Sequence, residues 1–166
     1  MKFSLIAVGF AALAAAAPLG ARQNNIFSTQ TFNDLSISGG TAGNGKQEAL
    51  DKLAGLPTDL TTVSKADLDF LNSVNQIANK AEKEAFNPAI EAATGDELDA
   101  LKAGKTKNKI LKLTATMLKL QAQQAQGQDV AAKMADEQKK LDNNIATDEA
   151  NAGNPSTALD FEASTA

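Results

Sequence analysis

The feature that most constrains the fold is a helical spacing of apolar residues, which runs through most of residues 64–153. In the first stretch, apolar side chains recur at steps of three and four, which places them on one face of a helix. They are Leu68, Leu71, Val74, Ala78, Ala81 and Ala85. Ser64 is expected to cap this helix at its start. Asn87-Pro88 is expected to bend or break it, because proline lacks an amide donor and clashes with the preceding turn.

Two more long helices are predicted downstream. Thr94 and Glu97 match a capping box, so the second helix is expected to begin at Thr94 and to reach about Gln126. Gly104 is a weak point within it. Asp129 is expected to cap the third helix, which ends near Gly153 and continues the apolar spacing through Val130, Met134, Leu141 and Ile145.

A short helix is predicted from Gln47 to Leu53, ended by Gly55-Leu56-Pro57. No alternation of apolar and polar residues is strong enough to predict a sheet. The expected fold is therefore all-α: an antiparallel bundle of three long helices and one short helix, preceded by a polar arm. Since the chain has no cysteine, tryptophan, tyrosine or histidine, its core is expected to be mostly aliphatic.

The N-terminus has the pattern of a secretory signal peptide. Met1-Lys2 is followed by an uncharged apolar run, FSLIAVGFAALAAAA, and then by small residues suited to cleavage. We predict a signal peptide over 1–21, with cleavage after Ala16 or Ala21. The remaining chain divides into a polar arm and glycine loop (22–45), the helical bundle (46–153) and a flexible tail (154–166). The mature protein is expected to be secreted and extracellular, without stable membrane insertion.

The composition removes most catalytic chemistry. Without histidine and cysteine, the usual Ser/His and Cys/His nucleophiles are impossible, and the preferred ligands of zinc are missing. Ser64-Lys65 is better explained by the cap at Ser64. The carboxylates Asp67, Asp69, Asp148 and Glu149 are interpreted as solvated side chains. We therefore expect a non-enzymatic protein with no catalytic residues, cofactor or metal.

The glycine loop resembles a phosphate-binding loop only in part. Gly40 to Lys46 fits the pattern G-x-x-x-x-G-K, in which backbone amides and lysine cradle phosphates. However, Gln47 replaces the serine or threonine that holds magnesium, and no buried strand precedes the loop. A flexible turn before a helix is the favoured interpretation.

The most organised polar feature is a row of five lysines on the second long helix, which we call the lysine stripe. Its members lie within about 100° of one another on a helical wheel and are Lys102, Lys105, Lys109, Lys112 and Lys119. Apolar residues cover the opposite half, where Lys107 must snorkel or lie near an end. The stripe is either a partner-binding surface or the solvated face of a helix packed on two neighbours.

Charge and composition leave the partner open between two classes. The net charge of −4 disfavours nucleic acid as a partner. The first hypothesis is an interaction protein that binds an unknown protein or surface through a helix face. The alternative is a surface- or amphiphile-binding protein that opens its alanine-rich helices and coats hydrophobic material.

Three stretches resemble the small secreted proteins of filamentous ascomycete fungi. They are NDLSISGGTAGNG (33–45), AFNPAIEAATGDELDALKAGKTKNKILKLTAT (85–116) and KLDNNIATDEANAG (140–153). The resemblance implies an extracellular protein of a lineage-restricted family, many members of which are candidate effectors. It implies no known activity and no catalytic residues. The lack of cysteine departs from the disulfide-stapled pattern common among effectors.

Overall fold

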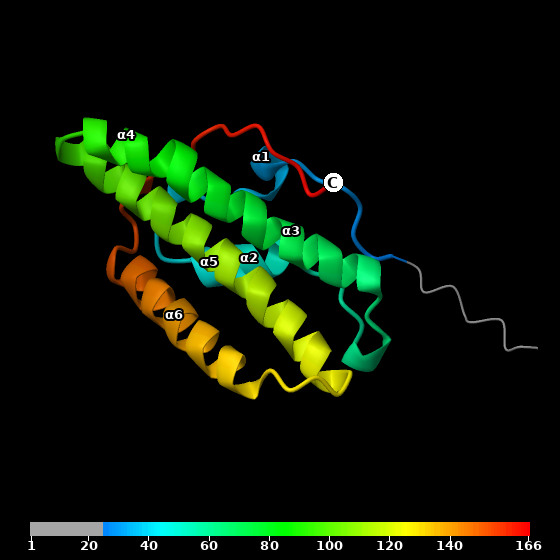
Figure 1. The fold of residues 1–166 in the computed structure, drawn as a ribbon. Helices are drawn as coiled ribbons and strands as arrows, with labels where there is room; N and C mark the ends of the chain where they lie inside the picture. The colour runs from blue at the N-terminus through cyan, green and yellow to red at the C-terminus, as the bar shows by residue number, and fades with distance from the viewer. Residues whose placement is uncertain (1–24) are drawn as a thin grey trace, which may run out of the picture.

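The computed structural model describes residues 25–166, so the predicted signal peptide over 1–21 lies outside the described residues. Within this range the chain is mostly helical, which confirms the all-α class (Figure 1). The long helices are α3 (Lys65–Ala81), α5 (Gly95–Ala125) and α6 (Ala131–Ala150), and the short ones are α1 (Phe32–Leu35), α2 (Gly45–Lys52) and α4 (Asn87–Ala92). A 3-10 turn, η1 (Leu60–Thr62), and a π-helical turn, η2 (Glu82–Phe86), complete the helical elements.

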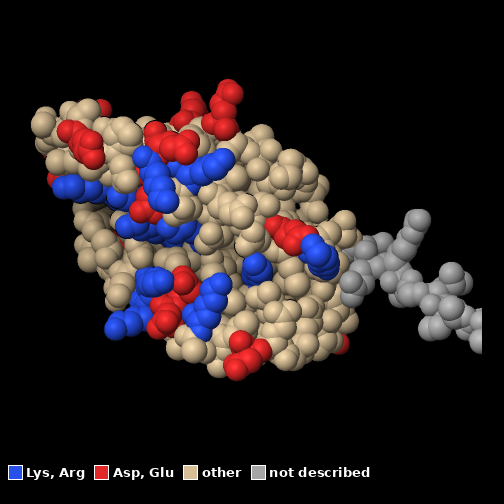
Figure 2. Space-filling view, viewed as in Figure 1, with Lys and Arg blue, Asp and Glu red and all other residues tan. Residues whose placement is uncertain are grey.

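Helix α5 is the central element, with α3 along one side and α6 along the other (Figure 1). Helix α2 also packs on α5. This position explains the wide apolar arc expected on α5, because a helix between neighbours buries more than one face. Acidic and basic side chains are interspersed over the outer faces of the helices, without a continuous basic patch on the side seen in Figure 2.

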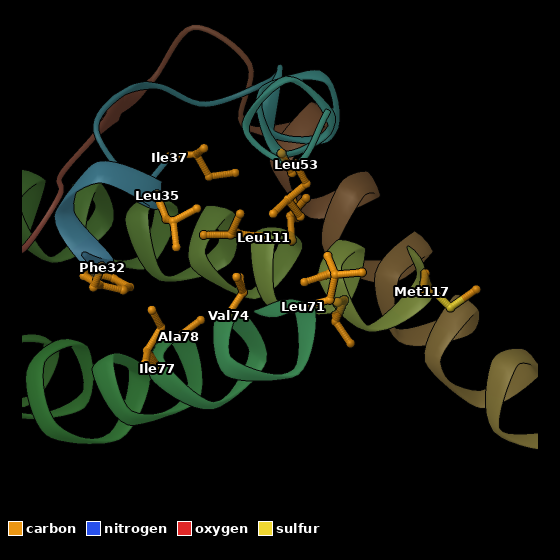
Figure 3. Close-up of a cluster of buried hydrophobic side chains, with 14 of the residues drawn as sticks. Phe32, Leu35, Ile37, Leu53, Leu71, Val74, Ile77, Ala78, Leu111 and Met117 are labelled. Atoms are coloured by element: carbon orange, nitrogen blue, oxygen red, sulfur yellow. The ribbon is translucent and has the colours of Figure 1, made fainter. Parts of the chain in front are cut away.

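The core is mainly aliphatic and draws on both ends of the described chain. Leu71, Val74 and Ala78 of α3 meet Leu111 of α5, with Phe32 and its neighbours from α1 (Figure 3). Alanines at the α3–α5 contact are fully buried, which allows close approach of the two helices. No helix in residues 25–166 is both long enough and apolar enough to span a membrane.

Among the long helices, the predicted starts at Ser64 and Thr94 were confirmed, and the start predicted at Asp129 was wrong by one residue. Ser64 caps α3 as expected, with its hydroxyl oxygen accepting from the Asp67 amide at 3.0 Å. Thr94 precedes α5, but its side chain makes no capping hydrogen bond. Asp129 does not cap α6, since Val130 holds the cap position. The capping box in the structure lies instead at Thr31 and Asp34, around α1.

Pro88 was predicted to bend or break the first long helix. Regular α-helix ends earlier, at Ala81; the chain then passes through the π turn η2 and resumes helix in α4, which itself contains Asn87 and Pro88. Proline has no amide to donate, and its ring disfavours the preceding regular turn. Widening that turn into a π turn, a form often found at functional sites, lets the helical path continue.

The polar arm is tied to α3. Asp67 is 1% exposed, and its Oδ1 accepts hydrogen bonds from the amides of Ile26 and Phe27 at 2.8 and 3.0 Å. The Phe27 ring stacks on Phe70 with centroids 4.5 Å apart. The interpretation of Asp67 as a solvated carboxylate is therefore wrong: it holds the arm and, with Ser64, the helix start.

Two sequence-based expectations fail at the C-terminus. A two-stranded antiparallel ladder joins β1 (Gly40–Thr41) to β2 (Pro155–Ser156), although no sheet was expected. Residues 154–166, expected to be a flexible tail, lie against the N-terminal part: the Phe32 amide donates to the Ala163 carbonyl at 2.8 Å. The Phe161 ring also packs edge-on to the Phe32 ring. Strands of two residues that pair between distant parts of the sequence are too short to show the alternation of apolar and polar residues by which a sheet is predicted.

Candidate functional site

The structure brings three of the five stripe lysines together around one glutamate. The Nζ atoms of Lys105, Lys109 and Lys112 lie 4.0, 3.5 and 2.7 Å from carboxylate oxygens of Glu82. We call these four residues the Glu82 cluster. The lysine side chains are between 17% and 35% exposed, so they lie at the edge of the helix interface and not on a fully solvated face.

The π turn places Glu82 and its helix neighbours opposite α5. Lys112 also donates to Asn79 Oδ1 at 3.3 Å, and Lys105 donates to Asn87 Oδ1 at 2.6 Å. Burial opposes ionisation of Glu82, but the Lys112 hydrogen bond and the charges of the three lysines outweigh it. The pKa of Glu82 therefore lies below its ordinary value. With Glu82 ionised, the cluster carries two positive charges in excess.

The other two stripe lysines lie apart from this cluster. Lys102 is exposed and lies 4.0 Å from Asp99 on its own helix. Lys119 donates to Asn72 Oδ1 of α3 at 2.9 Å. Burial, together with the positive charge of Lys133, lowers the pKa of Lys119. The predicted stripe is thus divided into one cluster and two separate lysines.

Lys107 was expected to snorkel or to lie near a helix end, and neither is the case. Its side chain is 1% exposed, and Nζ lies 2.8 Å from Glu48 Oε2. Nζ also donates to the carbonyls of Gly39 and Thr41 at 2.8 and 3.1 Å. All three ammonium protons therefore have acceptors, and Lys107 fastens the glycine loop to α5.

The glycine loop and Lys46 do not form a phosphate-binding cradle. Lys46 is exposed, while the Gly45 amide at the start of α2 donates to Asp148 Oδ2 of α6 at 2.8 Å. An acceptor at this position satisfies an amide that the helix itself leaves unpaired. Helix α2 begins at Gly45, two residues before the predicted start, because a distant residue supplies its cap.

Asp148 is the functional candidate that the sequence interpretation missed. It is 3% exposed, not solvated, and its Oδ1 has no hydrogen-bond partner within residues 25–166. It lines a cavity of about 570 Å³, which we call the Asp148 cavity, between α5, the end of α6 and the ladder. Its spacing from Leu141 and Ile145 could have indicated burial, since steps of four and three share a helix face.

The described residues contain no group of three or more Asp, Glu, His or Cys side chains arranged to hold a metal ion. The Glu82 cluster and the Asp148 cavity are both suited to binding a charged group of opposite sign. The Glu82 cluster offers excess positive charge at a partly exposed surface, and the Asp148 cavity offers carboxylates in a hollow.

Fold and site together define a mostly helical protein without cysteine, in which buried ionic contacts join the long helices to short flanking segments. Residues 27–160 match the family model of a domain of unknown function, DUF8454, and the chain belongs to this family. The Glu82 cluster and the Asp148 cavity both fall within the matched residues. No curated protein matches the chain, and no solved structure matches it.

Proposed function

We propose that this chain is a secreted, non-enzymatic interaction protein that binds an acidic partner at the Glu82 cluster. The observation that carries the proposal is the convergence of three lysines on one carboxylate. A single glutamate neutralises one of the three ammonium groups, so the excess charge attracts an anionic group on a partner. Lys109 contributes most directly, because its Nζ is 3.5 Å from Glu82 and makes no hydrogen bond to another described residue.

The setting of this function is part of the same proposal. The signal-peptide pattern over 1–21 and the resemblance to small secreted proteins of filamentous fungi support an extracellular protein, a candidate effector acting on a host or on the fungal surface. The proposal includes the antiparallel bundle expected for the three long helices. In such a bundle, a rigid α3–α5 pair holds the lysines in their binding positions before a partner arrives. Expression in a secreting fungal host tests the setting: the mature chain is expected in the medium with a new N-terminus at Ala17 or Arg22. An uncleaved, cell-retained chain would contradict it.

Binding is tested with the full mature chain and an immobilised oligoglutamate peptide. The triple variant Lys105→Gln, Lys109→Gln, Lys112→Gln is expected to lose binding by about tenfold or more, because it removes every excess positive charge from the cluster. The matched control, Lys46→Gln, Lys80→Gln, Lys139→Gln, has the same net charge but changes lysines that are exposed. Equal loss in both variants would mean that only net charge matters and would overturn the site.

Coating of hydrophobic material is the other outcome of this test. Large apolar residues in the described part of the chain are buried or partly buried, with Ile26 and Leu50 as the exposed exceptions. A coating protein would therefore have to open its helices. Adsorption to hydrophobic beads with a gain in helicity, and no binding to oligoglutamate, would favour coating over the proposed interaction. Circular dichroism of each variant confirms that the fold is kept.

A further inference from the structure

A small pocket lies where the second half of α5 passes between the middle of α3 and the first turns of α6 (Figure 1). Its volume of about 230 Å³ is below the range of about 300–1,000 Å³ typical of sites for drug-sized ligands, so it suits a small ligand. None of the four residues of the Glu82 cluster lines it. We call it the Lys119 pocket, and its polar lining residues are Asn72, Asn75, Thr116, Lys119, Lys133 and Glu137.

The pocket has an excess of positive charge. Two lysines line it, Lys119 of α5 and Lys133 of α6, against the single carboxylate of Glu137. That carboxylate is already paired, since Glu137 Oε1 lies 2.9 Å from Nζ of Lys140, a lysine that does not line the pocket. The charges of Lys119 and Lys133 are therefore not balanced by an unpaired carboxylate of the lining.

Lys119 is the lysine of this pocket whose charge is costly. Its burial and the positive charge of Lys133 both lower its pKa, and the opposing effect of Asp69 is smaller. Asp69 is itself in an ion pair with Lys65 on α3. Within residues 25–166, neither Lys119 nor Lys133 forms an ion pair. A bound anion would offset both the burial of Lys119 and its repulsion by Lys133.

The polar side chains around Lys119 offer a ligand mainly N–H donors. Lys119 Nζ donates one proton to Asn72 Oδ1 at 2.9 Å, which leaves two protons without an acceptor in the described chain. The Asn72 amide nitrogen likewise has no acceptor among the described residues. Asn75 Nδ2 donates to the Thr116 hydroxyl oxygen at 2.8 Å, and that hydroxyl donates to the Lys112 carbonyl at 2.9 Å. The complementary ligand is therefore negatively charged and rich in acceptors.

Size and charge together select the kind of anion. A divalent oxyanion balances two ammonium groups and accepts from several donors at once, whereas a single carboxylate balances only one of them. Two buried leucines, Leu71 and Leu120, complete the lining. Apolar neighbours lower the local dielectric constant, which strengthens an ionic hydrogen bond.

We propose that the Lys119 pocket binds a small divalent oxyanion of the size of phosphate. The ammonium groups of Lys119 and Lys133 bind it from α5 and α6, and the side-chain amide of Asn72 donates to it from α3. Because the donors come from three helices, the bound anion also links α6 to the α3–α5 pair. The site is independent of the binding proposed at the Glu82 cluster and would persist if that binding failed.

The test is titration of the full mature chain with sodium phosphate at constant ionic strength, followed by calorimetry and by amide chemical shifts. Saturable binding is expected, with shifts concentrated at the side-chain amide of Asn72 and at the backbone amides of Lys119 and Lys133. Sulfate is expected to displace phosphate, and chloride is expected not to. A second titration uses phosphoserine: binding of phosphate alone supports a site for the free ion, and binding of both supports recognition of a phosphate monoester.

Single variants test the two lysines. Lys119→Gln is expected to raise the Kd for phosphate about tenfold, as for loss of one charge-assisted hydrogen bond. Lys133→Gln is expected to raise it about threefold, because this lysine is exposed. Lys139→Gln is the matched control and is expected to leave the Kd unchanged, since it makes the same change at another exposed lysine of α6 that does not line the pocket. Circular dichroism checks that each variant is folded.

The triple variant of the Glu82 cluster separates this proposal from the previous one, because it is expected to lose oligoglutamate binding and to keep phosphate binding at the Lys119 pocket. Three results would each overturn the phosphate site. They are the absence of saturable binding to the wild type, equal weakening by Lys133→Gln and Lys139→Gln, and chemical-shift changes confined to the Glu82 cluster.

Discussion

At the scale of single residues, an ammonium group inside an apolar face is tolerated only when each of its protons meets an acceptor. Lys107 meets this condition through Glu48 and two loop carbonyls. Its spacing on the apolar arc indicated that it was unusual, but its three partners lie far earlier in the chain. Helical periodicity reports which face a residue occupies, and it does not report which distant backbone covers that face.

Replacing Lys107 tests this role directly. Lys107→Met keeps the aliphatic stem but leaves two loop carbonyls and Glu48 without their donor. We expect a loss of about 3 kcal/mol in the free energy of unfolding, measured by urea denaturation. Lys46→Met, at an exposed lysine in the first turn of α2, is expected to change stability by less than about 0.5 kcal/mol. A similar small effect for both variants would show that the Lys107 contacts add nothing to stability.

Glu82 gives a prediction for pH dependence. Its folded pKa lies below the ordinary value of 4.5, so its ionised form is stabilised by folding. The stabilisation is complete well above pH 4.5 and is lost as the pH falls through the lower folded pKa. Glu82→Gln is therefore expected to cost about 1 kcal/mol at pH 7 and almost nothing at pH 2.

The measurement compares urea midpoints of the wild type and Glu82→Gln across this range. Glu84→Gln serves as the control, because Glu84 is exposed on the same π turn. Its difference from the wild type is expected to be small at every pH. If the difference between Glu82→Gln and the wild type were constant with pH, the cluster would not favour the ionised glutamate.

At the scale of elements, the apolar spacing of three and four was sufficient to predict all three long helices and part of the face that each one buries. Their ends were harder to predict. Ser64 works as a cap because its partner, Asp67, lies in the next turn. Thr94 has the right sequence but makes no such bond, and α2 takes its cap from Asp148 more than 100 residues away. A local capping pattern therefore formed at Ser64 but not at Thr94, and a cap supplied by a residue as distant as Asp148 leaves no local pattern from which to predict it.

Position 104 in α5 is a glycine because the neighbouring C-terminal segment leaves no room for a side chain there. A Cβ built there would lie 2.0 Å from the Thr157 carbonyl oxygen and 3.2 Å from the Phe86 ring. The Thr157 amide donates to the Ala100 carbonyl at 3.0 Å, so the segment after β2 runs directly against the helix. The glycine that seemed a weak point of the helix is the place where the C-terminal segment crosses it.

Gly104→Ala is therefore expected to destabilise the protein, although alanine is the better helix former by about 1 kcal/mol. We expect a net loss of about 2 kcal/mol from overpacking, with faster hydrogen exchange at the Thr157 amide. Gly39→Ala is the control, because a Cβ there would meet Ala158 at an ordinary 3.5 Å. A more stable Gly104→Ala variant would show that the crossing segment moves aside at no cost.

At the scale of the whole molecule, the two ends of the described chain are joined to each other as well as to the helices. The Ser156 hydroxyl donates to the Ser38 carbonyl at 2.6 Å, and the Thr165 amide donates to the Gln30 carbonyl at 3.0 Å. These contacts join segments at opposite ends of the sequence and involve short polar stretches with no periodicity. The expectation of a flexible tail failed because a contact between two distant segments produces no recognisable pattern in the local sequence of either segment.

Removal of residues 158–166 tests whether this closure stabilises the fold. The truncation deletes the Phe161 ring that packs on Phe32 and the Ala163 carbonyl that accepts from the Phe32 amide. Since Phe32 is fully buried, we expect water to reach it and the free energy of unfolding to fall by about 3 kcal/mol. Hydrogen exchange is expected to speed up at Phe32 while amides in the middle of α5 stay protected.

Deletion of Ala166 alone, an exposed residue, is the control and should leave both measurements unchanged. If the longer truncation also left the unfolding midpoint and the Phe32 exchange rate unchanged, the C-terminal segment would contribute nothing to the fold.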